Sequence, residues 1–147
     1  KQNYQMLLFK DNTGLSIEYD EDNNTLQFHQ LHVCHDIAPF YAYACVCINN
    51  IILFFGGYGY KNDRYIYSKS VHKYSIRENK WMTFKNTLPN PLRSCIAILS
   101  EDNNYIHIIG GNNNKNAAIS IHMKTKVREL DPSQLVMIYL FIPIKHK

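Results

Sequence analysis

The stretch Ile51-Ile52-Leu53-Phe54-Phe55-Gly56-Gly57 decides the fold class, because it is an apolar run of strand length that ends in two glycines. β-Branched and aromatic residues in so short a run favour a strand over a helix. Glycine reaches positive φ without steric cost and lets neighbouring backbone approach closely. We therefore predict a buried strand that ends in a glycine turn.

A second copy of this pattern occupies residues 105–111, and its first glycine follows Gly56 by 54 residues. Each copy is preceded by another apolar run and a polar turn, and the first of these turns is Asn49-Asn50. Asparagine tolerates the left-handed backbone of a tight hairpin. A recurring unit of this length indicates a repeat architecture, here one made of strands.

The unit that begins near Tyr41 also contains a hairpin with an aromatic residue on each arm. Strands over 70–76 and 80–84, joined by a turn at 77–79, make Tyr74 and Trp81 cross-strand neighbours. An aromatic pair of this kind adds roughly 0.2–1 kcal/mol to the stability of a sheet. We predict that both rings belong to the sheet rather than to a ligand site.

The same spacing recurs in weaker form on both sides of this unit. Tyr19 and Leu26 repeat it upstream, where Gly14 is the nearest equivalent of the glycine pair. Downstream, a hairpin over 118–123 and 127–130 places His122 at about the tyrosine position and Leu130 at about the tryptophan position. The chain therefore carries three units, of which the middle one is intact.

This order of elements resembles the kelch repeat of β-propellers over residues 5–131, most specifically over 41–84. The resemblance implies that each unit is a four-stranded blade, and propellers carry 4–8 blades around a channel. We expect an all-β partial propeller of about two to three antiparallel blades. Further blades of a longer chain or self-association would cover its open ends.

The units divide the chain into four expected parts. These are the back of a degenerate first kelch unit (1–36), the intact unit (37–92), a second degenerate unit (93–131) and an apolar tail (132–147). The tail either begins a next blade or is a non-native end.

The resemblance also separates structural residues from candidate binding residues. It assigns structural roles to Gly56, Gly57, Tyr74, Trp81, Gly110 and Gly111. In the kelch family, the loops after the glycine pair and the connectors between blades grip partner proteins. Tyr and Arg are enriched at interfaces. The candidate partner-binding residues are Tyr58, Tyr60, Lys61, Arg64, Tyr65, Arg93 and Lys115. The alternative is that residues 58–69 form a solvated loop with Tyr65 and Tyr67 packed on the blade.

Metal and catalytic chemistry are not indicated by the spacing of the reactive residues. Several side chains that could bind zinc or copper cluster near the middle of the chain: His29, His32, Cys34, His35, Cys45 and Cys47. Geometry rather than number decides ligation, and cysteine is commonly a small buried hydrophobe. We expect no metal site, no cofactor and no catalytic residue.

Composition excludes other classes of partner. The net charge of +4 on 147 residues is scattered, which argues against nucleic acid, and the apolar run at 135–144 is too short to span a bilayer. Four unclustered cysteines favour a reducing, cytoplasmic location. We predict a non-catalytic scaffold that binds a protein partner. The alternatives are a copper- or zinc-dependent oxidase-like propeller and a decayed fragment without a partner.

Overall fold

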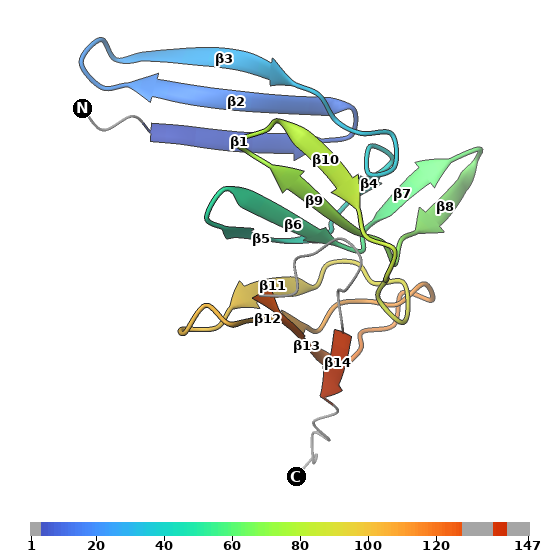
Figure 1. The fold of residues 1–147 in the computed structure, drawn as a ribbon. Helices are drawn as coiled ribbons and strands as arrows, with labels where there is room; N and C mark the ends of the chain where they lie inside the picture. The colour runs from blue at the N-terminus through green and yellow to red at the C-terminus, as the bar shows by residue number, and fades with distance from the viewer. Residues whose placement is uncertain (1–3, 128–136, 141–147) are drawn as a thin grey trace. The chain divides into compact units, whose positions relative to one another are not determined.

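The computed structural model describes residues 4–127 and 137–140, and these ranges contain strands but no α-helix (Figure 1). The strands form antiparallel sheets of three and four strands, which confirms the expected all-β, partial propeller class. The chain divides into two compact units, Lys1–Pro39 and Phe40–Lys147.

The first unit is a three-stranded meander in the order β1-β2-β3. Its strands are β1 (Tyr4–Lys10), β2 (Thr13–Asp20) and β3 (Thr25–Leu31). Tyr19 lies opposite Leu26, and its hydroxyl donates to Asn24 Oδ1 at 3.0 Å. Gly14 is not a turn residue equivalent to a glycine pair. It lies inside β2, where a Cβ would be 2.9 Å from the carbonyl oxygen of Leu31, so close approach of β3 requires glycine here.

The middle sheet of the second unit has the order β10-β9-β6-β5. Its strands are β5 (Ala44–Ile48), β6 (Ile51–Phe55), β9 (Val71–Ser75) and β10 (Lys80–Thr83). Asn49, with φ 53°, makes the predicted tight turn. Tyr74 lies opposite Trp81 with ring centroids 4.9 Å apart, which confirms the cross-strand pair. The Tyr74 hydroxyl donates to Asn79 Oδ1 at 2.8 Å, as the hydroxyl of Tyr19 does to Asn24 in the first unit.

The segment 58–69, which we expected to be a loop, instead contains a β-hairpin. Strands β7 (Tyr58–Lys61) and β8 (Arg64–Tyr67) pair with each other, and β4 (Phe40–Tyr41) pairs with β7. Asn62 and Asp63, with φ 51° and 59°, form the two-residue turn. Both residue types tolerate positive φ, so this turn matches the twist of the flanking strands.

The last sheet has the order β11-β12-β13-β14. Its strands are β11 (Ile96–Leu99), β12 (Tyr105–Ile109), β13 (His122–Lys126) and β14 (Met137–Leu140). The expected strand at 118–123 is displaced toward the C-terminus, and His122 does not occupy the position of Tyr74. Thr125 does, because it lies opposite Ile106 as Tyr74 lies opposite Ile52. Hydrophobic alternation alone did not define this register.

The tail expected to start a next blade or to be non-native contributes a strand to this same sheet. Met137 lies opposite Thr125, so β14 has the place that β10 has in the middle sheet. The sheet therefore extends past residue 131, where we expected the second degenerate unit to end. Leu130, the expected counterpart of Trp81, lies outside the described residues.

The core of the second unit lies between the middle and the last sheets. Fully buried residues of β6 and β12 meet there, together with two leucines of the connector before β11: Leu53, Phe55, Ile106, Ile108, Leu88 and Leu92. Burying side chains of this size contributes about 1.5–3 kcal/mol each. The connector is therefore held in the core rather than left as a free linker. In the described ranges, no helix is long and apolar enough to cross a membrane.

Candidate functional site

Main-chain hydrogen bonds gather three loops of the second unit at one end of its sheets. The amide of Gly57 donates to the carbonyl of Leu92 at 2.7 Å, which binds the connector to the end of β6. Arg93 and Asn112 exchange hydrogen bonds of 3.1 and 2.9 Å, which binds the same connector to the loop after β12. The hairpin β7-β8 begins directly after Gly57. The loops expected to project on one face therefore do lie together.

The hairpin carries its tyrosines on one side, which we call the tyrosine face and define as Tyr41, Tyr58, Tyr60, Tyr65 and Tyr67. Residues directly opposite each other in an antiparallel pair share a side, and next-but-one residues share it too. Tyr58 opposes Tyr67, Tyr60 opposes Tyr65, and Tyr41 of β4 opposes Tyr58. Ring centroids are 4.3 Å apart for Tyr41 and Tyr58 and 5.3 Å apart for Tyr60 and Tyr65. The rings therefore form one contiguous aromatic surface.

Arg93 adds a cation to this surface. The carbon at the centre of its guanidinium lies 4.5 Å from the centroid of the Tyr58 ring, within cation–π range. Its Nη2 donates to Asn116 Oδ1, and its Nε is buried with no hydrogen-bond partner among the described residues. The side-chain amide of Asn116 thus holds the positive charge of Arg93 against the Tyr58 ring.

A shallow cavity of about 190 Å³ opens between these groups, lined by Tyr58, Tyr65, Tyr67, Arg93 and Asn116. Small-molecule and cofactor pockets are usually larger, about 300–1,000 Å³. The size suits a single side chain of a partner better than a cofactor.

The other predicted binding residues, Tyr60, Lys61, Arg64 and Lys115, do not line this cavity. Lys61 and Arg64 oppose each other at the hairpin tip and, by strand alternation, point to the side away from the tyrosine face. Lys115 is exposed in the loop beside Asn116. The predicted binding residues did not include Tyr41, Tyr67 or Asn116. The sequence did contain the signal for the hairpin, two Tyr-x-Tyr segments close to Asn62-Asp63, which is a two-residue hairpin pattern.

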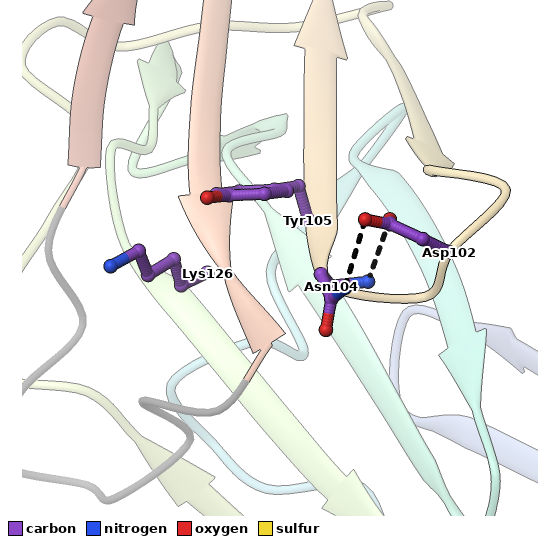
Figure 2. A pocket seen from close by; sticks show the side chains of 4 residues that line it. All are labelled: Asp102, Asn104, Tyr105 and Lys126. Atoms are coloured by element: carbon purple, nitrogen blue, oxygen red, sulfur yellow. Dashed lines mark hydrogen bonds between the residues drawn. The ribbon is translucent and has the colours of Figure 1, made fainter.

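A second cavity, of about 380 Å³, lies at the opposite end of β12 (Figure 2). It is lined by Asp102, Asn104, Tyr105 and Lys126. Asp102 accepts hydrogen bonds from the Ser100 hydroxyl and from the side chain and backbone of Asn104, which lower its pKa to about 2. A carboxylate with so low a pKa is a poor general acid or base near neutral pH. Its role in the structure is to hold the turn.

The described histidines and cysteines do not form a cluster, but two of the histidines lie close together. His107 Nδ1 and His122 Nε2 are 2.7 Å apart on neighbouring strands. Cys45 and Cys47 were expected in the core but are exposed, because their side of β5 faces away from the core. Within residues 4–127 and 137–140, no three His, Cys, Asp or Glu side chains are placed to hold a metal ion.

Comparison with known proteins identifies one motif and one fold. Residues 39–86 match the Kelch motif. The solved structure of YjhT resembles this chain with a TM-score of 0.64 at 15% sequence identity. The match covers 91% of this chain and 44% of YjhT, so the chain spans less than half the length of that protein. No curated protein sequence matches the chain.

Proposed function

We propose that this chain, a partial kelch-type β-propeller with a Kelch motif at 39–86, is a non-catalytic protein-interaction module. We propose the tyrosine face with Arg93 as its partner-binding surface. The observation that carries the proposal is the alignment of five tyrosines on one side of a paired hairpin beside a cation. Tyr and Arg are the residue types most often found as binding hot spots.

Two features of the surface support a macromolecular partner. Tyr60 and Tyr65 are 57% and 62% exposed, so large apolar area is available for burial. Pairing of β7 with both β4 and β8 fixes the tyrosines before binding, which reduces the entropy lost on association. The partner should insert one side chain into the cavity beside Arg93 and cover the remaining rings.

The test compares variants of the two sides of the same hairpin. A partner captured by cross-linking and identified by mass spectrometry should bind Tyr65→Ala at least about tenfold more weakly, a loss of about 1.4 kcal/mol. Arg64→Ala, which alters the other side of β8, is the matched control and should bind as the parent does. Equal affinity of the parent and the Tyr65→Ala variant would contradict the proposal.

We also propose a cytoplasmic location, because four unclustered cysteines suit a reducing compartment better than a secreted, disulfide-stapled one.

A further inference from the structure

Two histidines of the last sheet contact each other through their side chains. His107 lies in β12 between Ile106 and Ile108, which are fully buried, so strand alternation places His107 on the side that faces away from the core. His122 of β13 is on the same side, because it lies opposite Ile109. His107 Nδ1 and His122 Nε2 are 2.7 Å apart. The pairing of β12 with β13 therefore brings two imidazole nitrogens together.

The middle sheet shows that the repeat does not need histidine at either position. By their registers, β12 and β13 align residue by residue with β6 and β9. His107 then corresponds to Leu53, and His122 corresponds to Val71. Leu53 and Val71 are both 0% exposed and belong to the core. The last sheet has histidine at both of these apolar positions, and the two histidines contact each other. A ligand shared by the two rings explains both departures together, whereas strand pairing explains neither.

The surroundings of the pair favour neutral rings. Burial, and after it His122 and Lys124, lowers the pKa of His107 from its usual value, which favours the neutral ring at neutral pH. Lys124 lies opposite His107, but its Nζ is 3.6 Å from the centre of the Tyr105 ring. Tyr105 is the first residue of β12, whereas His122 lies opposite the last, so the ammonium is held away from His122. Neutral imidazole is the form that binds metal ions.

The distance between the two nitrogens is close to that of two ligands of one zinc ion. Zinc binds an imidazole nitrogen at about 2.0–2.1 Å, so two such nitrogens on a tetrahedral ion lie roughly 3.3–3.4 Å apart. His107 Nδ1 and His122 Nε2 need to separate by only about 0.6 Å, and both rings are half-buried, which leaves them room to rotate. In the neutral pair, one of these nitrogens donates its hydrogen to the other. On binding the ion, the donating ring carries that hydrogen on its other nitrogen, so no proton is lost.

We propose that His107 and His122 together bind one Zn²⁺ ion on the side of the last sheet that faces away from the core. Imidazole is a preferred ligand of zinc, and zinc imposes no geometry through its d electrons, so it accepts the angle that the two strands set. Water fills the remaining positions of a four-coordinate ion, which makes this an open site. Two protein ligands are fewer than most zinc sites have, so binding should be weaker than at a closed structural site.

Isothermal titration calorimetry of Zn²⁺ into the metal-free chain tests the site. The parent should bind one ion at the pair. His107→Leu and His122→Val should each bind it at least about tenfold more weakly, because even the outer-shell partners of a metal contribute 10–100-fold. These variants insert the residues that the middle sheet has at the same positions, so the circular dichroism of the parent should be kept.

The matched control removes the other zinc ligands that lie close together in the described sheets. Cys45 and Cys47 are exposed thiols on one side of β5. The double variant Cys45→Ser, Cys47→Ser should therefore keep the affinity of the parent at the histidine pair.

Nuclear magnetic resonance gives a check that does not depend on the fold of a variant. The first equivalent of Zn²⁺ should shift the ring resonances of His107 and His122 in the parent. The ring of His29, an exposed histidine of β3, should not shift.

Four results would overturn the proposal. They are no binding of Zn²⁺ by the parent, unchanged affinity in both histidine variants, loss of the site in the cysteine variant, and first shifts at His29 rather than at the pair. None of these results bears on the proposed partner-binding surface, because the tyrosine face and Arg93 share no residue with the histidine pair.

Discussion

Replacing the first glycine of each pair by alanine separates two reasons for glycine. Gly56 and Gly110 have nearly the same backbone, with φ of 69° and 64°, so alanine strains both by about 1–2 kcal/mol. Their surroundings differ. A Cβ at Gly56 would lie 2.2 Å from the carbonyl oxygen of Leu92, whereas a Cβ at Gly110 meets nothing within 4 Å.

The oxygen that a Cβ at Gly56 would strike cannot move away without loss. It accepts the 2.7 Å hydrogen bond from Gly57, and Leu92 itself is 1% exposed in the core. Overpacking costs about 1–3 kcal/mol and a lost hydrogen bond about 1 kcal/mol. We therefore expect Gly56→Ala to lower the free energy of unfolding by about 2–4 kcal/mol more than Gly110→Ala does.

Urea unfolding followed by tryptophan fluorescence measures this difference, because Trp81 is the one tryptophan of the chain and lies in the middle sheet. Equal slopes of the free energy against urea would show that both variants unfold from a comparable native state. If the two variants differed by less than about 0.5 kcal/mol, contact with the connector would not be the reason for glycine at Gly56.

Three further predictions concern the sheets and are tested by urea unfolding followed by circular dichroism. Trp81→Ala should cost about 2 kcal/mol, less than the 3–5 of a fully buried ring, because Trp81 is half-buried. Tyr74→Phe should cost about 1 kcal/mol in the parent, and clearly less in an Asn79→Gly background, where φ of 51° is kept without strain, if their hydrogen bond is the reason. Burial, and after it the neighbouring His122, lowers the pKa of His107 from its usual value of 6.5. As the pH falls through that value, the unfolded chain therefore binds more protons than the folded chain does. Stability should fall as the pH drops through 6.5, and less steeply in His107→Asn.

Local chemistry was enough to predict the repeat. The apolar run before Gly56 is too short and too rich in β-branched and aromatic residues for a helix. Gly56 and Gly57 both have positive φ, which agrees with the conformational freedom for which we expected glycine there. The pairing of Tyr74 with Trp81 follows from a seven-residue spacing around a short turn, which sets register locally. The hairpin at Asn62-Asp63 was also encoded locally, although it was read as a loop.

Tertiary structure decided the features that depend on register between distant strands. In the last sheet, Thr125 and not His122 occupies the position of Tyr74, and β14 is the fourth strand. Both features depend on pairing between strands that are joined by long loops, so no local spacing defines them. The candidate site is of the same kind. Its tyrosines are local to one hairpin, but Arg93 reaches Tyr58 only because Leu92 is buried and bonded to Gly57. Sequence determined which residues are available for binding, and burial of the connector determined which of them meet, because core packing acts between segments that are far apart in the chain.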